Sequence, residues 1–270
     1  PTVADAQAMR QAEIRYGRWI AIGYQWSYSA AIRALKADIL GGKLGHPLGF
    51  KTAISWPRDL KYYGRGTGWA GRIERDGVMI LDSIASNACA HYLHNMLFLL
   101  GGTMETSADA DALEASCWRA NKIENFDTCS IRAKAGGVPL YFIASHAAGR
   151  KRDPEFVYRF EKATVTFAQN EGSQIVATFA DGTVKNYGDP FASNFGKLWE
   201  CVSAVRDGFT PICTVETATA HTRLIERLWR EVPVREFPRE TVKFDEAKNR
   251  FYVEGLFERM YRAYANETML

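Results

Sequence analysis

The first forty residues show hydrophobic positions spaced for a helix, then a short strand, then a second helix. Apolar side chains recur at helical spacing over residues 4–16, and Gly17 follows them, so we predict a helix ending there. Residues 18–24 form a short apolar run that predicts a buried strand. Helical spacing returns over residues 29–40 and stops at Gly41-Gly42. This order is typical of α/β architecture.

The remainder alternates as antiparallel strands do. We predict a strand over 48–56, a glycine-rich loop over 62–71 and a long helix over 83–100. Further β-rich runs lie at 113–121, 128–135, 139–146, 156–168, 173–179 and 183–187. Further helices are expected at 193–206, 215–230 and 253–265, the last after a short strand pair near Thr241 and Phe251. Tight turns such as Asp181-Gly182 favour hairpins, so the predicted fold class is α+β: an open, mostly antiparallel sheet with helices packed on one face.

Composition narrows the classes of protein. The chain has 270 residues, 47% hydrophobic and 24% charged, with a net charge of +3, as expected of an ordinary globular domain. Lys and Arg form no stripe, so we expect no nucleic-acid partner. Apolar stretches are too short for a membrane span, and the N-terminus has no signal-peptide pattern. Five scattered cysteines without a C-x-x-C predict reduced core thiols in a cytoplasmic protein.

The glycine-rich loop contains a motif that invites a dinucleotide interpretation. Residues 66–71 fit G-x-G-x-x-G, and Asp82 follows an apolar run. The motif requires a buried strand before it and a helix after it, and neither flank shows that pattern. We therefore expect a substrate-side loop in which Tyr62, Arg65 and Trp69 stack on a sugar ring and bind its hydroxyls. The alternative is a surface loop pinned by a buried tryptophan.

Histidines on the predicted helix 83–100 are the candidates for chemistry. Asn87, His91 and His94 share one face at about 100° per residue. Asp82 falls elsewhere and is expected to cap the helix start, or otherwise to serve as an acid–base partner. His91 and His94 could ligate a metal only if a third ligand such as His146 or Glu155 converged, and there is no H-E-x-x-H, so we predict no metal site. His221 has only a weak claim to a role.

Three stretches together resemble a known family. They are residues 19–45, which include Trp19-Ile20-Ala21-Ile22-Gly23-Tyr24; residues 87–101, which include Asn87-Ala88-Cys89-Ala90-His91; and the hairpin region 155–187. In this order they resemble the Gfo/Idh/MocA family, which includes glucose–fructose oxidoreductases and inositol dehydrogenases. The resemblance implies an N-terminal Rossmann domain and a C-terminal α+β domain. Residues 1–28 would then be the last helix and strand of the Rossmann domain, and residues 29–270 the C-terminal domain.

The resemblance also implies an activity. It indicates an NAD(P)-dependent oxidoreductase, with NAD or NADP as cofactor, that acts on a sugar or cyclic polyol and forms a homo-oligomer through its sheet. His91 falls on the family's histidine position and suits the base of alcohol oxidation, whereas Asn87 stands where the family has a carboxylate. His94 and His146 are expected to bind substrate.

Two family features are absent from this sequence: the early glycine-rich turn and the Glu-Lys-Pro segment. Most of the cofactor site is therefore expected outside this chain, which alone should be inactive. The alternative is a non-catalytic oligomerisation or ligand-sensing module of the same fold.

Overall fold

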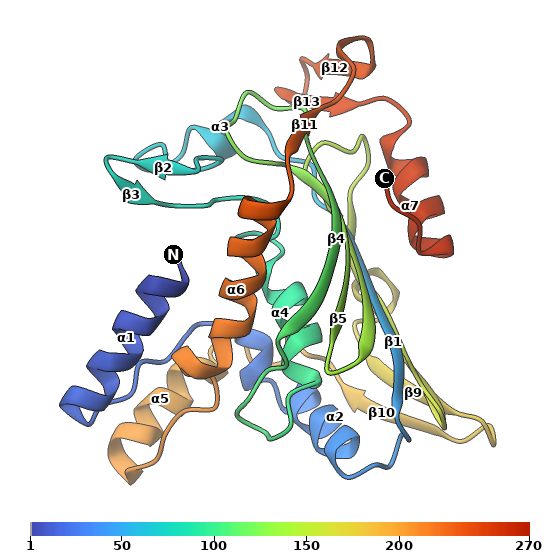
Figure 1. Ribbon diagram of the computed structural model, residues 1–270. Coiled ribbons are helices and arrows are strands. Elements are labelled where there is room, and N and C mark those ends of the chain that lie inside the picture. The colour runs from blue at the N-terminus through green and yellow to red at the C-terminus, as the bar shows by residue number, and fades with distance from the viewer. Residues whose placement is uncertain (1) are drawn as a thin grey trace.

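One nine-stranded sheet organises the computed structural model, which describes residues 2–270 (Figure 1). The strand order is β10-β9-β8-β7-β1-β6-β5-β4-β11. Neighbouring strands are antiparallel except for the β1–β6 and β4–β11 pairs. The bounds are β1 (Pro47–Ser55), β4 (Ala110–Arg119), β5 (Thr128–Ala135), β6 (Val138–Ser145), β7 (Arg152–Phe160), β8 (Ala163–Ala168), β9 (Ile175–Phe179), β10 (Val184–Gly188) and β11 (Val234–Glu236). The predicted mostly antiparallel sheet is confirmed.

The alternation of buried and partly exposed residues explains the strands and also one wrong boundary. In β7, Phe156, Tyr158 and Phe160 are buried, and the residues between them are not. β8 alternates as well, but its buried residues are the odd-numbered Ala163, Val165 and Phe167, so the phase changes within the single strand predicted over 156–168. The structure instead turns at Glu161-Lys162, where no glycine or proline marks the break.

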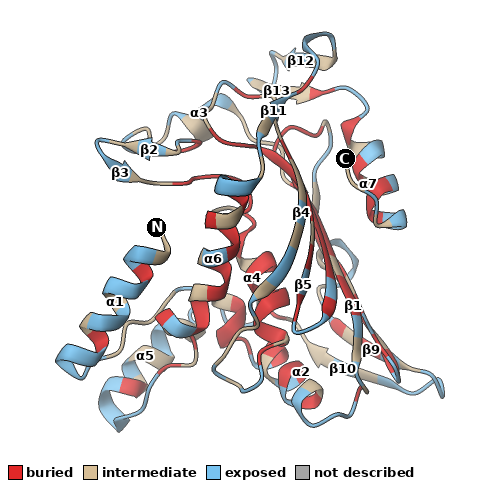
Figure 2. Cartoon of the chain, viewed as in Figure 1, coloured by how far each residue is buried: buried red, intermediate tan, exposed pale blue. Residues whose placement is uncertain are grey.

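Helices cover both faces of the sheet. On one face lie α2 (Ala30–Leu40), α4 (Ala90–Leu99) and α6 (Val215–Glu231), over a core that includes Phe50 and Ile54 of β1. On the other face α7 (Leu256–Asn266) packs Met260 toward Ala53 of β1 and Ile143 of β6 (Figures 1 and 2). The prediction of helices on one face only is therefore wrong, because β1 and β6 bury both of their sides.

Two more helices form an outer layer away from the sheet. The helix α1 (Val3–Tyr16) packs against α6, and α5 (Gly196–Asp207) packs against the short 3₁₀ turn η1 (Gln25–Tyr28). Figure 2 shows that both helices are largely exposed or intermediate. On α5 and the residue before it, the exposed large apolar side chains are Phe195, Leu198, Trp199, Val202 and Val205. Assembly of a homo-oligomer through the sheet stays a prediction.

The segment that joins α1 to η1 corrects the expected strand over residues 18–24. It makes one isolated bridge, between Ala21 and Thr214, and the Ile22 amide donates to the Cys213 carbonyl. An apolar run becomes a strand only beside a partner strand, and here its neighbour is the loop before α6. The proposed division at residue 28 stays a prediction, and Pro1 lies outside the described residues.

The remaining elements are short and lie around the end of the sheet near α3. They are α3 (Leu60–Tyr63), β2 (Glu74–Arg75), β3 (Val78–Met79), η2 (Gln169–Glu171), η3 (Arg239–Thr241), β12 (Val242–Asp245) and β13 (Arg250–Val253), of which η2 follows β8. Among residues 2–270, no helix combines the length and apolar character that a bilayer crossing requires. Four of the cysteines are buried, and Cys201 is partly exposed.

Candidate functional site

The approach to α4 differs from the predicted helix over 83–100. The helix begins at Ala90, and residues 84–89 form turns. Ser83 and Ser86 explain this, because the Ser86 hydroxyl donates to the Leu81 carbonyl and the backbone amides of both serines donate to each other's hydroxyls. Such local bonds compete with helical ones. Asn87 therefore lies in the turn before α4, and only His91 and His94 are helical.

A small cavity opens beside this turn. Its volume is about 240 Å³. The walls come from the connector before η1, the glycine-rich loop, the residues that follow β3, the turn before α4, and α6. The lining residues are Tyr24, Trp69, Ile80, Leu81, Asp82, Ser86, Asn87, His221, Thr222 and Ile225. Apolar walls with a few convergent polar groups are the usual form of a small-molecule site.

Tyr24 and His221 form a hydrogen-bonded pair in the cavity wall. The Tyr24 hydroxyl lies 2.8 Å from His221 Nδ1, and His221 Nε2 lies 3.1 Å from the Ala85 carbonyl oxygen. Because a carbonyl only accepts, Nε2 carries the proton and Nδ1 accepts from the tyrosine. Burial lowers the pKa of His221 to about 4 and raises the pKa of Tyr24. The imidazole is thus neutral at physiological pH.

Asp82 and Asn87 face the same cavity. The Gly71 amide donates to Asp82 Oδ2 over 2.6 Å, and burial raises the pKa of Asp82 despite that bond. The prediction that Asp82 caps a helix is wrong, since α4 begins eight residues later. The Asn87 side chain lies close enough to Asp82 to lower the pKa of that carboxyl through hydrogen bonding, although Asn87 Nδ2 is buried without a hydrogen-bond partner of normal geometry among residues 2–270. That donor is available to a ligand.

His91 lies behind Tyr24 rather than in the lining. It is partly buried at the start of α4, its ring meets Tyr24 edge-on at 5.7 Å, and its Nδ1 is buried without a partner in the described chain. Burial and, to a lesser extent, the nearby Lys197 ammonium lower the pKa of His91 to about 4.

His94 belongs to the core. Its ring is fully buried, stacks on Tyr24 at 3.9 Å and lies 3.0 Å from the Ser27 hydroxyl through Nε2. Burial holds the pKa of His94 well below its usual value. The His94 ring has no exposed surface that a substrate could touch, and it packs beneath the Tyr24 ring.

The glycine-rich loop brings Arg65 and Trp69 to the cavity. The Arg65 guanidinium carbon lies 3.6 Å from the Tyr62 ring centre and 4.9 Å from that of Trp69, which lines the cavity. His146 follows β6 and lies 5.4 Å from Tyr62, but it is buried, with Nδ1 2.8 Å from the Trp56 carbonyl oxygen. Of these predicted substrate residues, the structure places Trp69 in the lining and Arg65 against it.

Residues 66–71 do not fit a dinucleotide. The short helix α3 precedes them, and the two-residue strands β2 and β3 follow. The Gly71 amide donates to Asp82 Oδ2. A Cβ at Gly71 would lie 2.6 Å from the Ile123 side chain, so this glycine serves close packing. Residues 2–270 offer no strand–turn–helix cradle for a dinucleotide around this loop.

The rival metal site lacks its ligands in this geometry. Within residues 2–270, no group of three or more His, Cys, Asp or Glu side chains converges to hold an ion. The suggested third ligands have other partners: Glu155 pairs with Arg152, and His146 bonds the Trp56 carbonyl.

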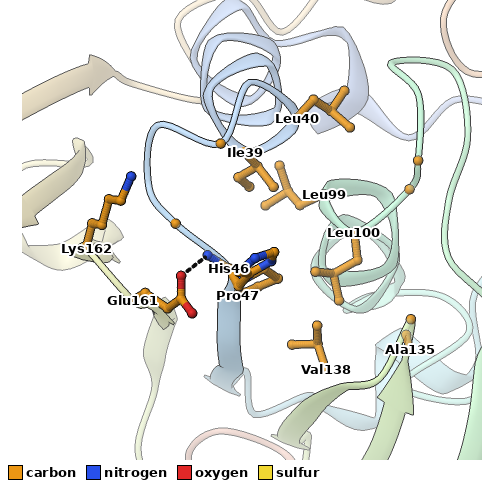
Figure 3. Close-up of a pocket in the computed structure, with 15 residues that line it drawn as sticks. Ile39, Leu40, His46, Pro47, Leu99, Leu100, Ala135, Val138, Glu161 and Lys162 are labelled. Atoms are coloured by element: carbon orange, nitrogen blue, oxygen red, sulfur yellow. Dashed lines mark hydrogen bonds between the residues drawn. The ribbon is translucent and has the colours of Figure 1, made fainter.

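A larger cavity of about 460 Å³ lies at the other end of α4 (Figure 3). Leu99, Leu100 and Val138 give it apolar walls, and the His46 amide donates to Glu161 Oε2 over 2.9 Å at its edge. The ten residues of α4 separate it from Asn87 by about 15 Å, at about 1.5 Å of rise per residue. It is therefore a separate hollow and not an extension of the candidate site.

The comparisons with known proteins bear on the fold. No protein-family model matches the chain, and no curated sequence does. Solved structures do match. An oxidoreductase from Agrobacterium radiobacter, solved in complex with NAD+, L-tartaric acid and magnesium, has a TM-score of 0.64 at 17% identity, over 95% of this chain and 71% of that chain.

Two other solved structures show the range of this fold. The WlbA dehydrogenase from Bordetella pertussis, in complex with NADH and UDP-GlcNAcA, has a TM-score of 0.63 at 18% identity, over 84% of this chain and 65% of its own. A super-repressor mutant of Gal80p from Saccharomyces cerevisiae has a TM-score of 0.64 at 14% identity, over 85% of this chain and 67% of that chain. The fold is that of Gfo/Idh/MocA-type oxidoreductases. The resemblance seen in the sequence is confirmed at this level.

Sequence reasoning missed Tyr24 and undervalued His221. The apolar run places Tyr24 at the end of the predicted strand 18–24, and the sequence pattern indicates no neighbour for its ring. His221 carried a usable signal, because it lies on the buried face of α6, in helical spacing with Ala218 and Leu224. A histidine at such a position needs a hydrogen-bond partner, and the structure supplies Tyr24.

Proposed function

We propose that this chain supplies the substrate-binding half of an NAD(P)-dependent oxidoreductase that acts on a sugar or cyclic polyol. The observation that carries the proposal is the cavity between Tyr24, Trp69, Asn87 and His221, in a fold shared with dehydrogenases. The cofactor would be held by a unit beyond the described residues. Neighbouring structures were solved with NAD+ or NADH, which supports that cofactor.

The cavity suits one sugar ring. Its volume of about 240 Å³ lies just below the roughly 300–1,000 Å³ of sites for drug-sized ligands. Trp69 offers an aromatic face on which the apolar side of a ring can stack. Asn87 Nδ2 and the Asp82 carboxyl offer a donor and an acceptor for hydroxyl groups.

The Tyr24–His221 pair would take part in proton transfer. Oxidation of an alcohol requires that its hydroxyl proton be removed. The substrate hydroxyl would donate its proton to the Tyr24 oxygen while the Tyr24 hydroxyl proton passes to His221 Nδ1. His91 remains the residue that the family pattern favours as base. To act as base, the His91 imidazole must turn toward the cavity, because in the structure it meets the Tyr24 ring only edge-on, at 5.7 Å, and no hydrogen bond joins the two.

Calorimetric titration of the chain with a panel of monosaccharides and inositols tests the proposal. We expect at least one ligand to bind, and Asn87→Ala to weaken its binding about tenfold, the usual effect of one lost polar contact. Asn170→Ala, at an exposed position in η2, is the matched control and should bind like the parent. Absence of any sugar binding, or equal losses in both variants, would contradict the proposal.

A second candidate is a ligand-sensing or oligomerisation module without catalysis. It is favoured by Asn87 in place of the family carboxylate and by a repressor with this fold, Gal80p. Turnover of NAD(P)H with a sugar panel by the natural full-length protein separates the two. Catalysis predicts turnover that falls by orders of magnitude in His91→Ala, whereas the module predicts sugar binding without turnover.

A further inference from the structure

Two arginines that flank α3, one of which reaches the edge of the candidate site, lack carboxylate partners. Many arginines of this chain form ion pairs, as Arg152 does with Glu155. Arg58 and Arg65 form none with the carboxylates of residues 2–270, although both are only partly exposed. They lie on the Tyr62 ring instead, with guanidinium carbons 4.7 Å and 3.6 Å from its centre. Stacking compensates part of the lost hydration of a guanidinium but supplies no counter-charge.

Arg65 stands at the edge of the cavity. Its guanidinium also lies over Trp69, which lines the cavity, and its charge lowers the pKa of Asp82. No ion pair joins Asp82 to Arg65 among residues 2–270, and Asp82 Oδ2 accepts from the Gly71 amide instead. The guanidinium at the edge therefore has no carboxylate in contact with it.

Arg58 is held next to further unused polar atoms. Its amide donates to the His146 carbonyl over 3.1 Å, and its own Nε is buried without a partner in the described chain. His146 Nδ1 faces the Trp56 carbonyl, so Nδ1 carries the proton and the buried, unpartnered Nε2 is a free acceptor. The Tyr63 hydroxyl is likewise buried and unpartnered between residues 2 and 270. Such atoms are rare in native proteins unless water or a ligand satisfies them.

The chemistry of these atoms describes a ligand. Guanidinium groups prefer the paired oxygens of a carboxylate or phosphate, and they bind them through charge-assisted hydrogen bonds. The lone pair of His146 requires a donor, which a hydroxyl group supplies. A molecule with an anionic group would pair with the arginines, and its hydroxyl groups would suit the polar residues Asn87 and Asp82 of the cavity.

We propose that Arg58 and Arg65 bind the anionic group of the substrate, so that the substrate is a sugar or polyol bearing a carboxylate or a phosphate. This inference rests on the proposed function and narrows it from sugars in general to acidic ones. The two arginines hold the acid group over Tyr62, and the ring of the sugar extends past Trp69 toward Asn87.

Calorimetry with three ligands tests the inference: glucose, glucuronate and glucose 6-phosphate. We expect one of the two acidic sugars to bind roughly ten or more times tighter than glucose at low salt, with a preference that declines as salt is added. Preference for glucuronate identifies the carboxylate, and preference for glucose 6-phosphate the phosphate. Arg65→Gln and Arg58→Gln should each remove most of the preference while glucose binding changes much less.

Arg72→Gln is the matched control, since it removes the same charge from an exposed arginine that pairs with Glu124. It should keep the preference. Equal binding of glucose and both acids would overturn the anion site and leave the proposed function standing. Absence of binding by all three ligands would overturn both. Thermal unfolding of each variant verifies that the loss is not one of folding, and Arg65→Lys, which retains the charge, should recover part of the preference.

Discussion

At the residue scale, the site depends on one tyrosine that three histidines surround. Tyr24 stacks on His94, bonds His221 and meets the edge of His91. The three histidines come from two helices that are far apart in sequence, so spacing along the chain predicted only the His91–His94 pair. Tyr24 joins them because the segment before η1 passes between α4 and α6. Local sequence patterns do not predict such a tertiary contact.

Substituting Tyr24 by Phe removes the hydroxyl and keeps the stack. His221 Nδ1 would then be buried without its donor, which costs about 1–3 kcal/mol of unfolding free energy. We also expect sugar binding to weaken, because Tyr24 lines the cavity. Denaturant unfolding and calorimetry measure the two effects. Unchanged stability would show that the Tyr24–His221 bond is not formed.

Asn87→Asp restores the family carboxylate and places it near Asp82. Two carboxyls in a buried site raise each other's pKa, so both would exceed their unfolded value of 3.8. An acid with a raised folded pKa binds more protons when folded, and stability therefore falls as pH rises. The variant should match the parent near pH 4 and lose stability toward pH 7. Denaturant unfolding across that range is the measurement, and a pH-independent difference would contradict it.

At the element scale, the ends of elements were easier to predict than their starts. The end of α4 before Gly101-Gly102 and the hairpin at Asp181-Gly182 were predicted from glycines and are present. The start of α4 was misplaced by seven residues because two serines bond the backbone of the preceding turn. The prediction of a strand over 18–24 is wrong for a different reason: a strand forms only where a partner strand from elsewhere in the chain lies beside it.

The two glycines after α4 offer a test of packing with a built-in control. A Cβ on Gly101 would lie 1.9 Å from the Thr106 carbonyl oxygen, whereas one on Gly102 would meet nothing within 4 Å. Gly101→Ala should therefore lower the free energy of unfolding by about 3 kcal/mol or more, and Gly102→Ala by less than about 0.5 kcal/mol. Thermal and denaturant unfolding compare them. Similar stabilities would mean that the loop at Thr106 is placed differently.

At the scale of the whole molecule, the sheet, its mostly antiparallel pairing and the family resemblance followed from alternation and order along the chain. The sequence pattern did not predict that helices cover the second face of the sheet. This coverage depends on α7 returning to β1 and β6, strands whose residues are buried on both sides. A run buried on both sides has no alternation, so the sequence did not show which helix lies on which face.

The buried histidines predict acid sensitivity of the whole fold. Burial lowers the pKa of His221 to about 4 and that of His146 to about 3, from a usual value of 6.5. The unfolded chain then binds more protons below pH 6.5, so stability is lost as pH falls from 6.5 toward 4. Each group contributes on the order of a few kcal/mol. Chemical unfolding from pH 8 to pH 4 measures the slope, and His146→Gln should reduce it.

The central claim is that the cavity beside Asn87 receives the sugar, and the side-chain amide of Asn87 reports on it directly. In a titration of the ¹⁵N-labelled chain, we predict that a bound sugar shifts the Asn87 Nδ2 resonances and leaves those of Asn170 unchanged. If the sugar binds while the Asn87 resonances stay fixed, the cavity is not the binding site and the account is wrong.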